Sequence, residues 1–222
     1  MLRSLVGSEM CIRDRYSASL KTLDDYVQRF ARDAPQFTPG SQDSYSNYGF
    51  IVLGRIIEAV SGQSYYAYVE EHILHPVGMT GTGFEPETAS VPKRAVAYTK
   101  HDGQWVRETK SLPWRGMSAG GGYSTVADMV KFAEALQGGK LVSPALLQQA
   151  TTAQNHKGWY GFGFVVQGEG REHQYGHEGG APGSNSAIVV LPAQGYVIVG
   201  LANVDPDAIG NVVNYIARRL PL

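Results

Sequence analysis

The chain has 222 residues, enough for one sizeable domain or for two unequal lobes that share a core. Its 43% hydrophobic and 18% charged residues are typical of a globular protein, and its formal net charge of -1, without a run of Lys or Arg, gives no electrostatic reason to expect nucleic-acid binding. The longest apolar runs, 188–191 and 196–202, are too short for a transmembrane segment, and the single cysteine, Cys11, leaves the cellular compartment unknown.

Residues 1–15 (MLRSLVGSEMCIRDR) do not read as a signal peptide, because Arg3, Glu9 and Arg13 interrupt any apolar segment. The stretch VGSEMCIRDR resembles translated sequencing-adapter sequence that is found in many unrelated proteins. We therefore expect residues 1–15 to be non-native, and residues 16–222 to be a partial domain of a protein that continues upstream of Tyr16.

Hydrophobic periodicity predicts mainly helices in the first part of the chain. Thr22 or Asp24 can cap the first helix, and Thr125 with Asp128 forms a capping-box pattern. The segment after Asn47 is apolar on nearly every face, which predicts a core helix. The predicted helices cover residues 22–32, 48–60, 64–73, 125–136 and 209–220, with a short one after Ser143-Pro144.

The second part of the chain changes to a strand pattern. Short strand-like pieces occur at 96–98 and 105–107, and longer ones at 159–166, 186–191 and 196–201. Residues 192–195 have the composition of a hairpin turn. Helices followed by antiparallel strands and a closing helix predict a helical lobe that rests on an α/β lobe.

Tyr45 and Asn47 stand two residues apart, immediately before the apolar helix. A phenol close to cations and partly desolvated can take a proton from a serine, and an amide can orient both a lysine and a substrate carbonyl. The alternative is that Tyr45 only packs and Asn47 only caps the helix.

Residues 176–180 (Gly-His-Glu-Gly-Gly) lie at the start of a strand pattern. His177 can supply a positive or hydrogen-bonding group, and Gly179 lets a substrate backbone approach closely. The N–H group of Gly180 can help to bind an oxyanion. The alternative is that His177 is an ordinary turn residue.

Read in order, FTPG (37–40), YSNYGF (45–50), LGRIIEAVSG (53–62), HPVGMTGTGF (75–84) and GHEGG (176–180) resemble the serine hydrolases related to class C β-lactamases, D-alanyl-D-alanine carboxypeptidases and family VIII-type esterases. The resemblance covers residues 20–222. It implies a β-lactamase/transpeptidase-like α/β fold, with an antiparallel sheet, flanking helices and an all-helical lobe, whose N-terminal part is missing.

The same resemblance implies hydrolysis of an ester, an amide or a small peptide through an acyl-enzyme, without a cofactor. Tyr45 and a lysine share the serine proton, Asn47 orients the substrate, and His177 assists electrostatically or protonates the leaving group. Gly179 and Gly180 line the substrate and oxyanion site. Where β-lactam-binding members carry a hydroxyl residue, this chain has Glu178, which we expect to repel a substrate carboxylate and so to disfavour β-lactams.

The family's nucleophile motif, Ser-x-x-Lys, is expected upstream of Tyr45 and is not there. The one Ser-x-x-Lys in the chain, Ser90–Lys93, follows Tyr45 and contains Pro92, so we expect a loop instead of the helix that this motif needs. The chain is therefore expected to be inactive by this route. Its exposed apolar faces are expected to make it fold poorly.

Two other classes of function remain open. Gly116–Gly120 fits the G-x-S-x-G elbow of α/β-hydrolases, with Ser118 as nucleophile and Asp128 and His177 following in the right order. The polar, proline-containing segment before it argues against the buried strand that such an elbow needs. The second of these two classes is a binding module of the β-lactamase-like fold that does not catalyse a reaction.

No metal site is expected. His72 and His75, like His173 and His177, have no carboxylate or cysteine nearby that completes a ligand set.

Three aromatic residues either line a cleft or pack in the core, and the sequence leaves both possibilities open. The residues concerned are Trp114, Trp159 and Tyr160.

Overall fold

The computed structural model describes residues 20–221 except 33, 35 and 36, so the expected non-native segment 1–15 lies outside the described residues. Contacts divide the chain into two compact units. Unit 1 contains the described residues up to Pro76, together with 82–94 and 109–123. Unit 2 contains residues 77–81, 95–108 and 124–222.

The helices of unit 1 begin at side chains that accept hydrogen bonds from the first turn. Thr22 caps the first helix in a complete capping box with Asp25, and Ser46 and Ser64 cap the next two. Gly62, with φ of 71°, ends the long helix in the left-handed conformation that glycine adopts without strain. The elements are α2 (Leu23–Phe30), α3 (Asn47–Ser61), α4 (Tyr65–Val69), η1 (Glu70–Leu74) and α5 (His75–Val77).

The core of unit 1 is a small apolar cluster of Leu23, Tyr26, Ile51 and Met117. It joins α2 to α3 and to the loop before Tyr123. The prediction that α3 is a core helix is wrong for one of its faces. The side chains on that face are largely exposed: Leu53 at 53%, Ile56 at 51% and Val60 at 83%.

The helix predicted at 64–73 continues to Val77, through Pro76. A π-helical turn, η1, precedes the proline, and the N–H of His75 donates to the carbonyl of Glu70 five residues back. The wider π-helical turn shifts the backbone hydrogen bonds by one residue just before Pro76, which has no N–H to donate. The helix therefore ends later than the proline suggests.

Unit 2 is built on a four-stranded antiparallel sheet in the order β3-β4-β5-β6. The predicted hairpin at 192–195 is confirmed, because Leu191 pairs with Tyr196 across it. A second turn, at Pro182-Gly183, joins β4 to β5. The strands are β3 (Val165–Gln167), β4 (Gln174–Ala181), β5 (Ser184–Leu191) and β6 (Tyr196–Ala202), and a short 3-10 helix, η2 (Gly170–Glu172), joins β3 to β4.

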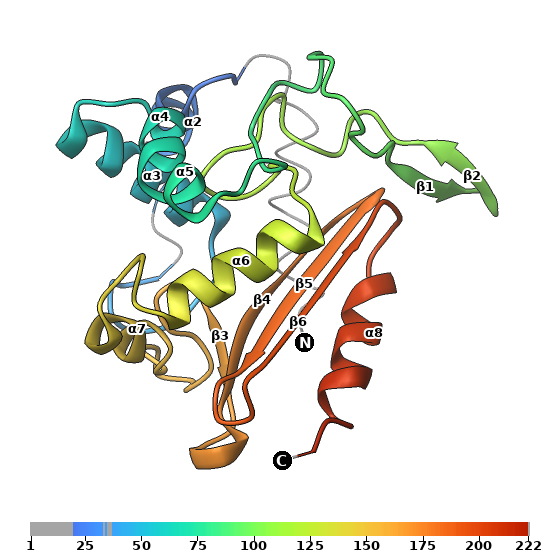
Figure 1. Ribbon diagram of the computed structural model, residues 1–222. Coiled ribbons are helices and arrows are strands. Elements are labelled where there is room, and N and C mark those ends of the chain that lie inside the picture. Colours follow the sequence, from blue (N-terminus) through green and yellow to red (C-terminus); the bar gives the residue numbers. More distant parts are fainter. Residues whose placement is uncertain (1–19, 33, 35–36, 222) are drawn as a thin grey trace. The chain divides into compact units, whose positions relative to one another are not determined.

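A helix covers each face of this sheet (Figure 1). Ala133 and Leu136 of α6 (Val126–Gln137) pack with Tyr175 and Val190 on one face. On the other face, a Cβ atom added at Gly200 would collide with side chains of α8 (Ala208–Ala217). Successive residues of a strand point to opposite faces, so residues 175, 177 and 179 of β4 share the α6 face, and 176, 178 and 180 share the α8 face.

The strand predicted at 159–166 is mostly wrong. Only Val165 and Val166 of that range lie in β3, and Tyr160 makes an isolated bridge to Val165. Gly161 and Gly163 turn the chain between them: Gly163 has φ of 84°, and Gly161 lies so close to the carbonyl of residue 150 that no side chain fits there. The segment folds back on β3 in place of extending it.

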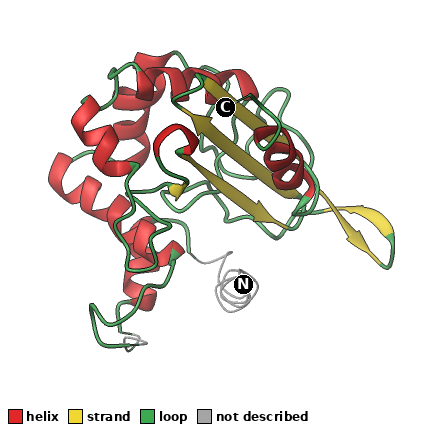
Figure 2. Ribbon diagram, turned by 90° about the horizontal axis from the view of Figure 1, so that it is seen from below, coloured by secondary structure: helices red, strands yellow, loops and turns green. Residues whose placement is uncertain are grey.

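The remaining elements of unit 2 are close to expectation. Strands β1 (Tyr98–His101) and β2 (Gln104–Arg107) form a two-stranded hairpin that extends away from the large sheet (Figure 2). Its turn, Asp102-Gly103, has positive φ at both residues, as a two-residue hairpin loop requires. Helix α7 (Pro144–Ala150) is capped by Ser143. In the part of the chain that the structure describes, no helix has the length and apolar character to cross a bilayer.

Candidate active site

Tyr45 and Asn47 lie at the N-terminal end of α3, in unit 1. Ser46, between them, is the residue that caps the helix: its hydroxyl accepts a hydrogen bond from the N–H of Gly49 at 3.2 Å. The alternative that Asn47 serves as the cap is therefore wrong. The ring of Tyr45 lies 5.7 Å from that of Phe50, and the side chains of Tyr45 and Asn47 are half-buried.

His177 lies on the α6 face of β4, and both of its ring nitrogens have partners. Nδ1 lies 2.7 Å from the carbonyl oxygen of Glu178, and Nε2 lies 3.0 Å from the hydroxyl of Tyr160. A carbonyl oxygen can only accept, so Nδ1 carries a proton. In the neutral ring, Nε2 then accepts from the Tyr160 hydroxyl. His177 is therefore a strand residue with a fixed tautomer, and not a turn residue.

Glu178 points to the opposite face of the sheet from His177. Its carboxylate accepts a hydrogen bond from Asn214 of α8 at 2.8 Å and lies against Gly210 of the same helix. The expectation that this carboxylate meets and repels a substrate carboxylate is wrong, because the strand alternation turns it toward α8. Glu178 gives no reason to exclude any substrate class.

Gly179 and Gly180 are exposed, and each has a close neighbour where a side chain would begin. A Cβ atom at Gly179 would lie 3.0 Å from the Ser186 hydroxyl oxygen, and one at Gly180 would lie 2.5 Å from Pro206. The carbonyl of Gly179 accepts from the side-chain amide of Asn185 at 2.9 Å. Both positions thus require glycine because neighbouring side chains already occupy the space that a Cβ atom would need.

The pairing of β3 with the outer edge of β4 stops at residue 176. Strand β3 pairs only with residues 174–176, whereas β5 pairs with 175–181. Among the described residues, no strand covers the outer edge of 177–181. Alternate backbone N–H and C=O groups of an antiparallel strand face its outer edge, so β3 leaves this edge of β4 uncovered next to His177.

The structure therefore places the predicted site residues in two groups. Tyr45 and Asn47 belong to unit 1, at the start of α3. His177, Gly179 and Gly180 belong to unit 2, in consecutive positions on β4. The second group forms a local arrangement with Tyr160, whose importance the sequence did not reveal.

The elbow hypothesis for Ser118 is wrong. The hydroxyl oxygen of Ser118 is buried, has no hydrogen-bond partner among the described residues, and packs against Gly54 of α3. Met117 and Gly120 bond to each other through both backbone pairs, so Ser118 lies in a tight turn, without a strand before it or a helix directly after it. The carboxylate of Asp128 accepts from Gly81 and Lys131.

The loop expected at Ser90–Lys93 is confirmed. Ser90–Lys93 contains no helix, and Lys93 has φ of 63° in a turn. Within the described part of the chain, no three His, Cys, Asp or Glu side chains group as metal ligands. Tyr160 lies beside His177, and its ring centroid is 5.0 Å from that of Trp159, whereas Trp114 lies in unit 1 under the ammonium of Lys21.

The family model for Beta-lactamase matches residues 8–220 of this chain. The chain belongs to the β-lactamase family. This match agrees with the antiparallel sheet flanked by helices and confirms the predicted fold class.

Members of the family that resemble this chain include penicillin-binding proteins and an amidohydrolase. A Bacillus subtilis (strain 168) protein named "Putative penicillin-binding protein PbpX" is 31% identical over 90% of this chain and 50% of its own length. The crystal structure of a penicillin-binding protein from Bacillus halodurans has a TM-score of 0.83 and 30% identity, over 90% of this chain and 64% of its own. A D-stereospecific amidohydrolase from Streptomyces has a TM-score of 0.75 and 27% identity, over 91% of this chain and 62% of its own.

The chain thus spans about half the length of that curated relative.

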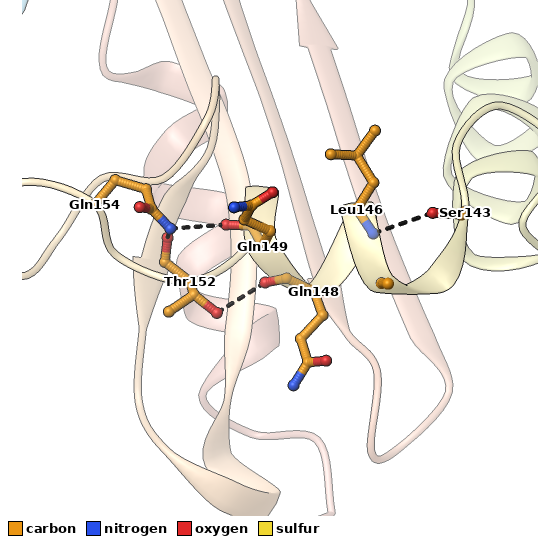
Figure 3. Close-up of a pocket in the computed structure, with 7 residues that line it drawn as sticks. Ser143, Leu146, Gln148, Gln149, Thr152 and Gln154 are labelled. Atoms are coloured by element: carbon orange, nitrogen blue, oxygen red, sulfur yellow. Dashed lines mark hydrogen bonds between the residues drawn. The ribbon is translucent and has the colours of Figure 1, made fainter.

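The pocket drawn in Figure 3 lies on α7 and the residues that follow it, in unit 2, and has a volume of about 740 Å³. None of its lining residues is titratable or is a predicted site residue. They are Ser143, Ala145, Leu146, Gln148, Gln149, Thr152 and Gln154.

Sequence reasoning missed two residues that hold the β4 site together. Asn185 is 5% exposed; it donates to Gly179 and accepts from the N–H groups of Ile209 and Gly210 at 2.7 and 3.3 Å. Tyr160 binds His177 from a loop 17 residues earlier. No local pattern marks either contact, because each depends on how β4 pairs with its neighbours.

Proposed function

We propose that the protein containing this chain is a serine hydrolase that cleaves an amide, ester or small-peptide bond through an acyl-enzyme. The observation that carries the proposal is the outer edge of β4 beyond residue 176, which no described strand covers and where His177 lies close to two glycines. Such an edge can pair with an extended substrate through backbone hydrogen bonds alone. Membership of the β-lactamase family supports the same chemistry.

The proposed reaction assigns each predicted residue a role. Tyr45 takes the proton of a serine hydroxyl, the serine oxygen attacks the substrate carbonyl carbon, and the Gly180 N–H binds the resulting oxyanion. Collapse of this intermediate breaks the bond to the leaving group, which receives a proton from Tyr45 or His177. Water then releases the acyl group, and the serine regains its proton.

The nucleophile in this proposal comes from outside the 222 residues. The sequence contains a single Ser-x-x-Lys, at Ser90–Lys93, and that segment forms a turn. A serine and a lysine three apart share a face only on a helix, so this pair cannot act together. We therefore propose that the 222-residue chain by itself does not turn over substrate.

For the substrate, we propose an amide or short peptide of a D-amino acid. The D-stereospecific amidohydrolase from Streptomyces supports this choice through its similarity over most of the chain. The orientation of Glu178 toward α8 is compatible with it, since no carboxylate of β4 then faces a substrate on the His177 side.

The test compares the 222-residue chain with a protein extended upstream along its source gene. We expect the extended protein to hydrolyse D-amino-acid amides and to gain the mass of one acyl group on a serine in rapid-quench mass spectrometry. Tyr45→Phe should lower kcat by about 10²- to 10⁴-fold, the range of general acid–base catalysis. Tyr48→Phe is the matched control, because it removes the hydroxyl of a nearby tyrosine that donates to the carbonyl of Val27 at 3.4 Å and has no assigned role in the reaction.

Two outcomes contradict the proposal. Turnover by the 222-residue chain equal to that of the extended protein would place the nucleophile within these residues. Substrate affinity without turnover or adduct in the extended protein would leave a binding module as the better description.

A further inference from the structure

We propose that Tyr160 is a positioning residue that holds the His177 ring in one orientation through a cycle of proton transfer. The inference rests on the proposed function for its catalytic meaning, and on geometry for the contact itself. The Tyr160 hydroxyl lies 3.0 Å from Nε2, and the two rings meet edge to face, with centroids 5.8 Å apart and planes at 85°.

The two partners of the ring differ in what they can do. The carbonyl of Glu178 accepts from Nδ1–H, at 2.7 Å, whether the ring is neutral or protonated. A phenol both donates and accepts: it donates to the lone pair of neutral Nε2, and it accepts from Nε2–H once the ring is protonated. Both nitrogens therefore keep a partner in both protonation states, and the ring gains nothing by flipping.

Consequently, Nε2 is the only nitrogen of His177 that can exchange a proton with a substrate. Nδ1 stays committed to the backbone of its own strand. A leaving group that takes the Nε2 proton replaces the Tyr160 oxygen as its acceptor for that step. The ring is then neutral, and the Tyr160 hydroxyl rotates and donates to the lone pair of Nε2 again.

The loop that carries Tyr160 is itself fixed at several points. The side-chain oxygen of Asn155 accepts from the N–H groups of Trp159 and Tyr160, both at 3.0 Å, and the carbonyl of Tyr160 accepts from the N–H of Gln154 at 2.8 Å. A bridge to Val165 ties the loop to β3. Asn155 thus acts on His177 indirectly, because it fixes the backbone position of Tyr160.

The first experiment measures the ring directly, in the 222-residue chain, by ¹⁵N-edited NMR of histidine at a pH where His177 is neutral. We expect a single Nδ1–H tautomer, with the Nε2 signal shifted by an accepted hydrogen bond. In Tyr160→Phe that shift should disappear, while the Glu178 carbonyl still accepts from Nδ1–H. Tyr196→Phe, on the far strand β6, is the control and should leave the spectrum unchanged.

The second experiment uses the extended protein. Loss of one neutral hydrogen bond predicts a decrease in kcat of about 3- to 10-fold for Tyr160→Phe, with KM nearly unchanged, because the contact positions a group and does not bind substrate. Asn155→Ala should show the same decrease. Asn155→Asp keeps the acceptor oxygen and should restore most of the rate.

These outcomes separate the inference from the proposed function. If the extended protein has no hydrolase activity, the proposed function fails, while the NMR result still decides whether Tyr160 fixes the ring. If Tyr160→Phe leaves the Nε2 shift unchanged, the inference is overturned even in an active enzyme. An increase in KM with kcat unchanged would also overturn it, because it would make Tyr160 a substrate-binding group.

Discussion

Asn185 shows how a single buried side chain can join two elements of unit 2. Its amide donates to the carbonyl of Gly179 on β4, and its oxygen accepts from the first N–H groups of α8, at Ile209 and Gly210. These N–H groups have no partner within the helix. The same side chain therefore satisfies the start of α8 and supports the glycine pair of the candidate site.

Asn185→Ala is expected to lower the free energy of unfolding by about 2 to 3 kcal/mol, because it leaves buried donors and an acceptor without partners. Urea denaturation followed by circular dichroism measures the change. Asn211→Ala, at an exposed position of α8, is the matched control and should change the stability by less than about 0.5 kcal/mol. Equal losses in the two variants would contradict the assigned role of Asn185.

At the scale of elements, the packing of α8 on the sheet depends on a residue without a side chain. Gly200 of β6 faces Ile209 and Val213, and a Cβ atom there would lie 2.9 Å from a methyl carbon of Val213. Gly49 of α3 is the opposite case: its nearest neighbour would be the Cβ of Ser46, at 3.8 Å. The same substitution should therefore have opposite effects in the two elements.

Gly200→Ala is expected to destabilise the protein by about 1 to 3 kcal/mol through overpacking between β6 and α8. Gly49→Ala is expected to stabilise it by about 0.5 to 1 kcal/mol, since alanine restricts the unfolded chain and favours a helix. Denaturation midpoints of the two variants test both signs. A stable Gly200→Ala protein would show that α8 can shift on the sheet at little cost.

Asp205 connects three segments of unit 2. Its carboxylate accepts from the N–H groups of Gly183 at 2.8 Å and Lys100 at 3.0 Å, and so ties the loop before α8 to the β4–β5 turn and to the β1–β2 hairpin. Burial raises the pKa of this carboxyl, but the hydrogen bonds from Lys100, Gly183 and Thr99 outweigh it and hold the pKa below the ordinary value of 3.8.

Because the pKa of Asp205 is lower in the folded state, its stabilising contribution is complete above pH 3.8 and is lost as the pH falls through the folded-state pKa. Asp205→Asn should therefore cost about 1 kcal/mol at neutral pH, and less in acid. Urea denaturation of the parent chain and the variant, once at neutral pH and once in acid, measures this difference. Asp207→Asn makes the same charge change at the N-cap position of α8, where the side chain makes no capping hydrogen bond, and it should cost less at neutral pH.

At the scale of the whole molecule, the exposed apolar face of α3 is the most conspicuous departure from an ordinary soluble surface. Leu53, Ile56 and Val60 lie at helical spacing on one side, with exposed fractions of 53%, 51% and 83%. Apolar side chains grouped in this way favour association between molecules.

We expect the 222-residue chain to self-associate at micromolar concentration, and the double variant Ile56→Lys/Val60→Lys to remain monomeric, as measured by light scattering. Leu146→Lys removes a similarly exposed residue, 46% exposed, from α7 and should not reduce association. Association that persists in the double variant would assign it to another surface.

Much of the secondary structure followed from the sequence, because local chemistry decides it. Thr22, Ser46 and Ser143 cap helices with their own side chains, and the turn at 192–195 reverses the chain within a few residues. The order of the motifs around Tyr45 and His177 was enough to predict the β-lactamase family, which the family match confirms. Their assignment as catalytic residues stays a prediction.

The tertiary structure decided what depends on pairing between distant segments. His177 lies on the α6 face of β4 and Glu178 on the α8 face. The expectation that Glu178 repels a substrate carboxylate was therefore wrong. The packing of Gly54 buries Ser118, which removed the elbow hypothesis although its sequence pattern is complete. A sequence pattern fixes which groups a chain offers, but the direction in which a side chain points is set by the strand or helix that packs against it.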